Sequence, residues 1–230
     1  MIKRYLEEEG SRHAMEFNRK IKMDGLKLLS MLDDCYTKCV FFDPQYRGVL
    51  DKLSYGNEGK NRGAARSALT QMTEDTIRQF INEIGRVLRP SGYLFLWIDK
   101  FHLCEGVADW FDNEVLEIVD LIVWDKQKIG MGYRTRRKSE YLIVLQKKPK
   151  LAKATWSTHC IPDVWGERAD KVHAHSKPVG LQAELISAVT NEGDIVLDPA
   201  AGGYSVLEAC KNTRRNFLGC DIAFGEEVIV

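Results

Sequence analysis

The chain has 230 residues, the size of one ordinary domain, and its 44% hydrophobic and 29% charged residues are typical of a folded protein and exclude a disordered one. Lys and Arg total 33, as do Asp and Glu, so the formal net charge is zero and a uniformly basic protein is excluded. The amino terminus has no apolar signal segment, no apolar run could span a membrane, and the six cysteines are scattered, so a cytoplasmic protein without membrane contact is expected.

The amino-terminal region is charged and weakly patterned. Residues 1–16 show no period and predict a helix or a loose arm, whereas 17–23 alternate like a short strand and end at Asp24 and Gly25, a turn-forming pair. Leucines spaced on one helical face then predict a helix over 26–32. The expected order here is therefore strand, turn and helix.

A strand buried on both faces is predicted next. Residues 39–42, Cys-Val-Phe-Phe, are all apolar, as in a central strand of a parallel sheet, and the run stops at Asp43. Residues 47–72 are polar and aperiodic, and a segment of this length is usually a functional loop. Thr73, followed by two acids and an apolar stripe, predicts a helix that the Pro-Ser-Gly of 90–92 ends.

Strands and helices alternate in the rest of the chain. Strands are predicted at 93–99, 116–124, 140–146, 195–197 and 217–222. Helices are predicted at 101–115, 178–190 and 206–213. This alternation predicts the α/β class, with a single Rossmann-like, doubly wound domain over 1–230 whose sheet is mostly parallel and has one antiparallel edge strand.

Acidic residues end two of these strands. Asp198 closes the strand that begins at 195, and the small residues up to Gly203 would let a ligand approach the backbone and the free N–H groups of the next helix. Asp221 ends the following strand about 20 residues later, the offset at which an acid holds the hydroxyls of a ribose. A nucleotide-like cofactor is therefore predicted, with an ordinary βα turn as the alternative.

The residues after strand 39–42 form a second unusual group. Pro44 fixes the backbone and has no N–H, so the Asp43 carboxylate and the Pro44 carbonyl present acceptors, while Tyr46 adds a flat ring. Acceptors that hold both N–H protons of a base amine can localise the lone pair of its nitrogen, and stacking on a ring holds the base in place. This group therefore suits a base that carries an amino group.

These motifs resemble those of the amino-group DNA methyltransferases. Asp43-Pro-Gln-Tyr46 is similar to their catalytic DPPY motif, 198–203 to their methyl-donor loop, usually DPFxGSG, and 17–29 to their amino-terminal GDxLxxL pattern. The catalytic motif precedes the donor loop, an order that resembles the circularly permuted β group, and the resemblance covers 17–222. It implies the methyltransferase fold, S-adenosylmethionine as cofactor, and methylation at N6 of an adenine flipped out of double-stranded DNA.

The resemblance also implies which residues form the site. The expected catalytic residues are Asp43, Pro44, Gln45 and Tyr46. The expected cofactor-binding residues are Asp24, Gly25, Asp43, Lys177, Asp198, Pro199, Ala200, Gly202, Gly203, Asp221 and Ile222. Three residues depart from the family pattern: Gln45 replaces a proline, Ala200 replaces a phenylalanine that packs on the cofactor, and Tyr204 replaces the last glycine of the donor loop.

The charge of the chain is unevenly distributed. Residues 126–153 contain ten basic residues and a single acid, Glu140, whereas 105–125 contain seven acids and no base. Such a basic stretch suits phosphates, so 126–172 and the 47–72 loop are predicted to contact or recognise DNA, with a solvated charged face as the alternative. The expected nucleic-acid-binding residues are Lys60, Arg62, Arg66, Arg134, Arg136, Arg137 and Lys138.

Several alternatives stay open at this stage. N4-cytosine methyltransferases usually carry serine at the position of Asp43, RNA or a protein amide could replace DNA, and a catalytically silent protein of this fold could simply bind nucleic acid or a protein partner. No metal is expected, because the His- and Cys-containing stretch 159–175 lacks the paired-cysteine spacing of zinc sites. The segment 147–172 is short for a recognition domain, so a homodimer, or the 47–72 loop, would help to cover the DNA.

Overall fold

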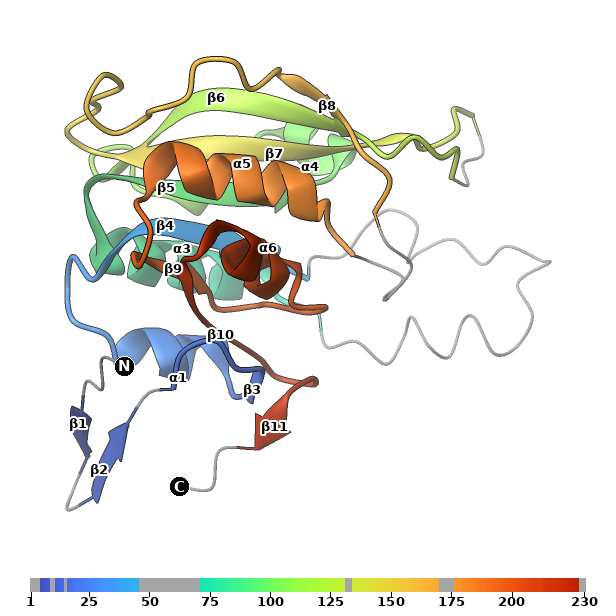
Figure 1. The fold of residues 1–230 in the computed structure, drawn as a ribbon. Helices are drawn as coiled ribbons and strands as arrows, with labels where there is room; N and C mark the ends of the chain where they lie inside the picture. Colours follow the sequence, from blue (N-terminus) through green and yellow to red (C-terminus); the bar gives the residue numbers. More distant parts are fainter. Residues whose placement is uncertain are drawn as a thin grey trace, which may run out of the picture.

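The computed structural model describes residues 5–8, 11–14, 16–45, 71–130, 134–169 and 176–227 (Figure 1). The strands are β1 Tyr5–Glu8, β2 Ser11–Ala14, β3 Ile21–Lys22, β4 Thr37–Phe42, β5 Leu88–Ile98, β6 Leu116–Asp125, β7 Ser139–Lys147, β8 Val164–Gly166, β9 Ile195–Asp198, β10 Asn216–Asp221 and β11 Glu226–Glu227. The helices are α1 Gly25–Ser30, α3 Glu74–Val87, α4 Lys100–Glu105, the short 3₁₀ helix η2 Ala108–Trp110, α5 Val179–Val189 and α6 Ser205–Thr213.

A nine-stranded sheet in the order β11-β3-β10-β9-β4-β5-β7-β6-β8 runs through the described residues. Every neighbouring pair in it is parallel except the two pairs that β7 makes, which are antiparallel. The mostly parallel α/β sheet is confirmed, but the position expected for the antiparallel strand is wrong. Strand β7 lies inside the sheet between β5 and β6, because it folds back from β6 as a hairpin and then pairs along β5 from Ile98 to Tyr93.

Helices cover both faces of the sheet, as expected for a doubly wound fold. Figure 1 shows α5 and α6 together on one side of the strands, with α3 on the other. Alternate side chains of β4 enter two different core clusters: Val40 and Phe42 pack with α1 and α3, whereas Cys39 and Phe41 pack with α5 and α6. The apolar run at 39–42 is therefore buried on both faces. Each phenylalanine buried in this way stabilises the fold by about 1.5–3 kcal/mol.

Three local expectations differ from the structure. Residues 1–16 contain the β1–β2 hairpin rather than a helix or an arm. Strand β5 begins at Leu88, before the predicted 93, because Leu88 pairs with Thr37 and a register irregularity precedes the regular pairing of Tyr93 with Cys39. The helix predicted over 101–115 is divided into α4 and η2, because α4 ends at Gly106, whose φ of +90° favours glycine.

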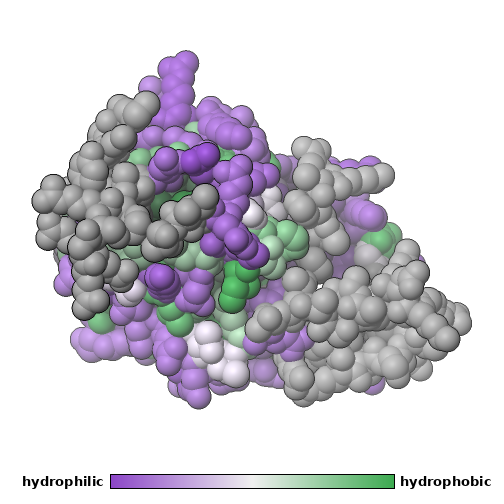
Figure 2. Space-filling model, turned by 90° about the horizontal axis from the view of Figure 1, so that it is seen from below, coloured by the Kyte–Doolittle hydropathy of each residue, from purple (hydrophilic) through white to green (hydrophobic). Residues whose placement is uncertain are grey.

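The face shown in Figure 2 is mainly polar where its residues are described. Seen from the side of Figure 2, hydrophilic residues dominate and hydrophobic ones form small, separate patches. Among the helices of the described ranges, none combines the length and the hydropathy that crossing a bilayer requires.

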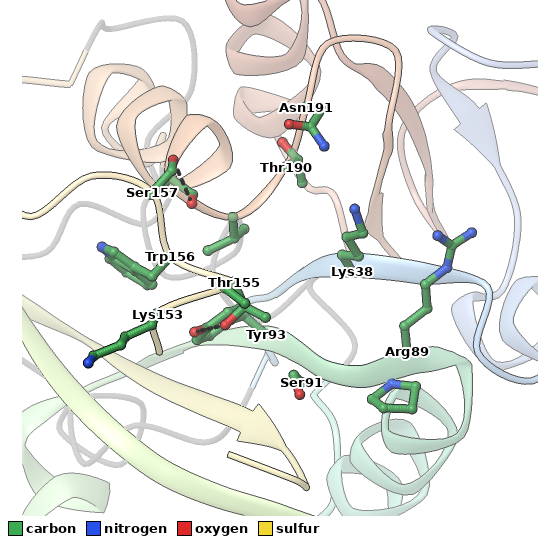
Figure 3. Close-up of a pocket in the computed structure, with 14 residues that line it drawn as sticks. Lys38, Arg89, Ser91, Tyr93, Lys153, Thr155, Trp156, Ser157, Thr190 and Asn191 are labelled. Carbon is green, nitrogen blue, oxygen red and sulfur yellow. Dashed lines mark hydrogen bonds between the residues drawn. The ribbon is translucent and has the colours of Figure 1, made fainter. Parts of the chain in front are cut away.

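A pocket of about 240 Å³ lies at the edge of the sheet where the parallel strands begin (Figure 3). Lys38, Arg89 and Lys153 contribute cations to its lining, with Trp156 at one side. Lys38 comes at the start of β4 and Arg89 at the start of β5, so the pocket is remote from the strand ends at which the sequence predicts chemistry. The acidic strand ends lie at the opposite edge of the sheet.

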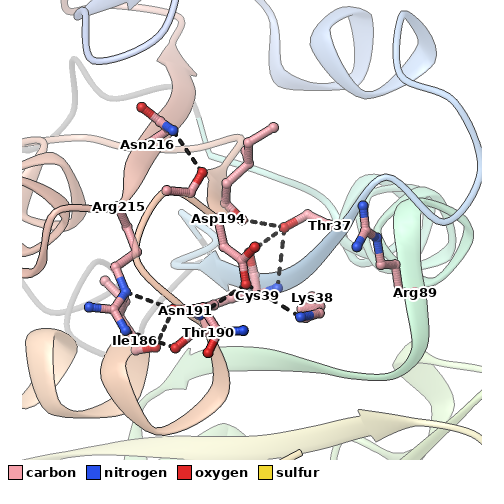
Figure 4. A network of polar contacts seen from close by, with 12 residues as sticks. Thr37, Lys38, Cys39, Arg89, Ile186, Thr190, Asn191, Asp194, Arg215 and Asn216 are labelled. Carbon is pink, nitrogen blue, oxygen red and sulfur yellow. Dashed lines mark hydrogen bonds and ion pairs between the residues drawn. The ribbon is translucent and has the colours of Figure 1, made fainter. Parts of the chain in front are cut away.

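A polar network next to this pocket joins the loops that precede β9 and β10 (Figure 4). Lys38 pairs with Asp194 at 3.4 Å, and the Arg215 guanidinium donates to the Thr190 carbonyl at 2.8 Å. The Asn216 side-chain amide donates to the Gly193 carbonyl, also at 2.8 Å. These bonds hold the beginnings of β4, β9 and β10 in register, which in turn fixes where the three strands end.

Candidate active site

The ends of three adjacent strands bring three carboxylates to one edge of the sheet. Asp221 ends β10, Asp198 ends β9, and Asp43 directly follows β4. These strands are neighbours in the order β10-β9-β4 and run parallel, so the two motifs meet although they lie far apart in the sequence. The predicted catalytic and donor motifs therefore share one edge.

Asp198 is the most buried of the three acids. Its side chain accepts a hydrogen bond from the Ala200 backbone N–H at 3.2 Å. Burial, against the lowering effect of that hydrogen bond and with help from the negative charges of Asp43 and Asp221, raises the pKa of Asp198 to about 8. Asp198 is therefore mostly protonated at neutral pH, in keeping with the negative charges of Asp43 and Asp221 beside it.

Removal of the Asp198 charge should stabilise the protein at alkaline pH. The pKa of Asp198 is 3.8 in the unfolded state and about 8 in the folded state. Between these two pH values the folded state keeps a proton that the unfolded state has lost. The free energy of unfolding therefore falls as the pH rises through this range. Asp198→Asn cannot ionise, and its Tm should exceed that of the wild type by several degrees at pH 8.5 and by much less at pH 5. Thermal denaturation at both pH values, without added ligand, tests this; an equal difference at both would contradict it.

The loop after Asp198 is anchored to the neighbouring strand end. The Gly202 N–H donates to the Asp221 carboxylate at 3.1 Å, and the N–H groups of Ala223 and Phe224 donate to its other oxygen at 2.8 and 2.9 Å. Gly202 has a φ of +47°, and no described atom lies within 4 Å of the position that a Cβ would occupy. Residues 198–203 thus form an open, glycine-lined loop beside the carboxylate expected to hold a ribose.

The Asp24-Gly25 pair contacts the same loop. Asp24 caps α1 by accepting the Lys27 backbone N–H at 2.9 Å. A Cβ on Gly25 would lie 2.1 Å from the Pro199 carbonyl oxygen, so only glycine lets α1 approach the loop this closely. The turn predicted here is therefore the start of α1, and it places Asp24 beside the predicted cofactor-binding residues.

Tyr204 departs from the family pattern without entering the site. It adopts the left-handed conformation, with φ 58° and ψ 35°, just before α6. Its ring is buried 6.0 Å from that of Phe217, and its hydroxyl lies 2.8 Å from the carbonyl oxygens of Ile21 and Phe224. The strain of this conformation, about 1–2 kcal/mol, is offset by the burial of the ring. Tyr204 thus ties β3 to the segment after β10.

Lys177 lies against the residue expected to be catalytic. Its Nζ is 2.9 Å from Asp43 Oδ2 and 2.9 Å from Glu140 Oε2. Pro44 and Gln45 continue from Asp43, and the Gln45 carbonyl accepts the Met72 N–H at 2.7 Å. Tyr46, together with most of the 47–72 loop and its Lys60, Arg62 and Arg66, lies outside the described residues.

Comparison with known proteins agrees with this arrangement. Residues 37–226 match the N6_N4_Mtase family of DNA methylases. The chain belongs to this family. It is 63% identical over 212 residues to the Type II methyltransferase M.HhaII of Haemophilus parahaemolyticus, a match that covers 91% of this chain and 93% of that protein. The family shows that the chain is a DNA methyltransferase.

Solved structures share the fold of this DNA methyltransferase. The M1.HpyAVI–SAM complex has a TM-score of 0.61 at 19% identity and covers 88% of this chain and 92% of its own. The cytosine-N4-specific PvuII DNA methyltransferase also has a TM-score of 0.61, at 13% identity, and covers 90% of this chain and 86% of its own. At such identities the likeness concerns the fold alone.

The residues at this edge fit S-adenosylmethionine, the cofactor that the sequence predicts. The negative charges of Asp43 and Asp221 suit a cationic cofactor, and the open loop at Gly202 leaves room beside Asp221. Ile222, directly after Asp221, is 60% exposed and offers an apolar surface for a base. Ala200, in place of the family's phenylalanine, is half-buried and packs against the core.

The basic stretch of this DNA methyltransferase does not form one surface. The described residues between β6 and β7, 126–130 and 134–138, lie at the edge that holds Asp43, whereas 147–153 follow β7 at the opposite edge. At that opposite edge Lys147 donates to the Leu88 carbonyl at 2.7 Å, and Lys150 pairs with Glu117. Of the ten basic residues in 126–153, those of the β6–β7 connection follow β6 at the edge that holds the catalytic motif.

The arginines of this connection differ in their surroundings. Arg134 and Arg136 are exposed, and the Arg136 Nε donates to the Gly130 carbonyl at 2.8 Å. Arg137 is half-buried, with its guanidinium 5.6 Å from the centre of the Phe101 ring, and Lys138 pairs with Asp125 at 2.8 Å. Arg134 and Arg136 are therefore the better placed to meet phosphates.

Lys177 owes its position to the segment before α5. The Glu167 carboxylate accepts the N–H groups of Gly180 and Leu181 at 2.9 and 3.0 Å, which caps the beginning of that helix. The Trp165 indole N–H donates to the same carboxylate at 2.7 Å. Trp165 thus belongs to the anchor of the helix that follows Lys177.

Sequence reasoning assigned no role to Glu140, which the structure places beside Lys177. A signal for it was nevertheless present, since Glu140 is the single acid among the ten basic residues of 126–153. An isolated acid in such a stretch indicates an ion pair with a particular partner.

Proposed function

We propose that this DNA methyltransferase acts on N6 of adenine in double-stranded DNA, with the base rotated out of the helix. Its methyl donor is S-adenosylmethionine, which supplies an electrophilic methyl group on a sulfonium. The observation that carries the proposal is Asp43-Pro44 at the end of β4, beside the carboxylates of the donor loop. In double-stranded DNA, a base would have to rotate out of the stack to bring its amino group to this edge.

The residues of the chain would act chiefly by positioning the base. The Asp43 carboxylate and the Pro44 carbonyl would accept the two N–H protons of the amine, which localises the nitrogen lone pair and directs it toward the 198–203 loop. Tyr46 would stack on the base. Negative charge at Asp43 would stabilise the positive charge that develops on the nitrogen, and the surplus proton would leave to Asp43 or to solvent.

N4 of cytosine is the second candidate for the methylated atom. The fold likeness to a cytosine-N4-specific enzyme supports it, because both amines are exocyclic and need the same pair of acceptors. Aspartate at position 43, where N4-cytosine methyltransferases usually carry serine, favours adenine.

Identification of the methylated base tests the proposal directly. The protein would be incubated with S-adenosylmethionine and unmethylated double-stranded DNA. The DNA would then be digested to nucleosides, which would be separated by chromatography and identified by mass spectrometry. N6-methyl-2′-deoxyadenosine as the product is expected. N4-methylcytosine as the sole product would overturn the adenine assignment, and methylation confined to single strands or to RNA would overturn the substrate assignment.

The β6–β7 connection is proposed to contact the DNA backbone. Removal of one cation that binds a phosphate should reduce the slope of log affinity against log salt by about one, so Arg134→Ala combined with Arg136→Ala should flatten it by about two and weaken binding. Lys150→Ala, which removes a cation at the opposite edge, is the control and should leave the slope unchanged. Fluorescence anisotropy over a salt series measures both; equal slopes in all three proteins would place these arginines away from the DNA.

A homodimer and a cytoplasmic location are also proposed. A homodimer is supported by exposed apolar side chains on one face of β6 and β8, namely Ile118, Leu121 and Val164. A cytoplasmic location is supported by the DNA substrate. Sedimentation at micromolar concentration would test the dimer.

A further inference from the structure

We propose that Glu140 is a positioning residue for methyl transfer, which acts through Lys177 to fix the Asp43 carboxylate and to maintain negative charge beside it. The proposal rests on the proposed function in one respect, since it takes Asp43 as an acceptor for the substrate amine. Glu140 is the second residue of β7, where the basic β6–β7 connection returns to the sheet.

Four charges of alternating sign form a chain that ends at Asp43. Lys177 Nζ lies 2.9 Å from Asp43 Oδ2 and 2.9 Å from Glu140 Oε2, and Glu140 Oε1 lies 2.8 Å from Lys126 Nζ. The chain joins the end of β4, the segment before α5 and the base of the β6–β7 hairpin. Glu140 thus holds the lysine that pairs with Asp43.

Two buried indoles hold the lysines of this chain in place. Lys177 Nζ lies 5.0 Å from the centre of the Trp97 ring, and Lys126 Nζ lies 5.8 Å from that of Trp124. The two rings pack edge to face at 5.9 Å. The Lys177 side chain is only 13% exposed, so loss of either of its carboxylate partners would leave a poorly solvated ammonium that must find another arrangement.

Glu140 and Lys177 act as fixed charges in this chain. Burial raises the pKa of Glu140, but Lys177 and Lys126 more than offset it and hold that pKa at about 2. Burial lowers the pKa of Lys177, whereas Asp43 and Glu140 raise it well above its ordinary value. Both groups are therefore ionised over the whole pH range in which an enzyme is assayed.

The charge count explains why a second carboxylate matters. Lys177 with Asp43 alone would be a neutral pair, and the ammonium would withdraw charge from the acceptor that the amine needs. Because Glu140 also pairs with this ammonium, the Lys177 charge is divided between two carboxylates and neutralises Asp43 less completely, although Lys126 makes the group of four neutral as a whole. Methyl transfer places positive charge on the amine nitrogen, and a negative environment stabilises that transition state.

The first test compares two Glu→Gln variants of the β6–β7 strand pair. Glu140→Gln should lower kcat at least about tenfold, equivalent to about 1.4 kcal/mol, while KM for DNA and the Kd for S-adenosylmethionine change less than about twofold. Glu117→Gln breaks the ion pair with Lys150 at the opposite edge and should leave kcat within about twofold of the wild type. An unchanged kcat in Glu140→Gln would overturn the proposal.

A double variant distinguishes action through Lys177 from general damage. In a Lys177→Met background, Glu140→Gln should cause no further loss of kcat, because the group through which it acts has been removed. If Glu140→Gln lowers kcat by the same factor in the Lys177→Met background as in the wild type, the proposal is overturned. Should Glu140→Gln fail to fold in thermal denaturation, Glu140→Asp, which keeps the charge on a shorter side chain, should fold and give an intermediate kcat; a kcat equal to the wild type would overturn the positioning role. The mass of the methylated base is determined separately, so an error about adenine and an error about Glu140 are distinguishable.

Discussion

Asp43→Ala is expected to abolish methyl transfer or to reduce kcat at least about a hundredfold, the loss that follows removal of one strong acceptor or donor aimed at developing charge. The carboxylate lies at the end of a strand buried on both faces and pairs with a nearly buried lysine at 2.9 Å, so its position is fixed before substrate binds. Single-turnover methylation of DNA, with tritium-labelled donor, measures the effect.

The affinity for S-adenosylmethionine separates a catalytic from a structural role for Asp43. The Kd measured by calorimetry should change less than about tenfold in Asp43→Ala, because the side chain is proposed to act on the base. Asp43→Asn keeps one acceptor oxygen and should retain more activity than the alanine variant. Wild-type turnover in Asp43→Ala would contradict the assignment. So would a loss of activity that is fully explained by a large rise in the Kd for S-adenosylmethionine.

Asp221→Ala is expected to weaken S-adenosylmethionine binding about ten- to a hundredfold. A charge-assisted hydrogen bond contributes about 1.5–3 kcal/mol, and this carboxylate is proposed to hold the ribose hydroxyls. It also anchors the donor loop through the Gly202 N–H at 3.1 Å, so its loss should loosen the loop as well. Calorimetric titration of the variant with S-adenosylmethionine gives the affinity.

Asp99→Ala is the matched control for this experiment. Asp99 also follows a parallel strand, β5, but its carboxylate caps α4 by accepting the N–H groups of Phe101 and His102 at 2.9 and 3.0 Å. Loss of that cap should lower stability by about 1 kcal/mol and leave cofactor affinity unchanged. Equal affinities of Asp221→Ala and the wild type would remove Asp221 from the cofactor site.

The local sequence by itself determined the framework of the site. The apolar run at 39–42 specified a strand buried on both faces, and the acids at Asp43, Asp198 and Asp221 marked where three strands stop. These are local signals, because a strand buried on both faces has a nearly continuous apolar run, and the polar residue that interrupts the run marks where it stops. The rule that parallel strands end at one edge then placed the catalytic and donor motifs together.

Only the tertiary structure decided how these residues are held. Periodicity could not show that β7 inserts beside β5, because a hairpin can pair on either side of its first strand. Periodicity also could not show that the basic residues of 126–153 lie at opposite edges of the sheet. They are separated because β7, which lies between the two groups in the sequence, runs from one edge to the other. Lys177 meets Glu140 and Asp43 across three elements. Such contacts depend on distances in space between side chains that are far apart in sequence, and no local pattern encodes them.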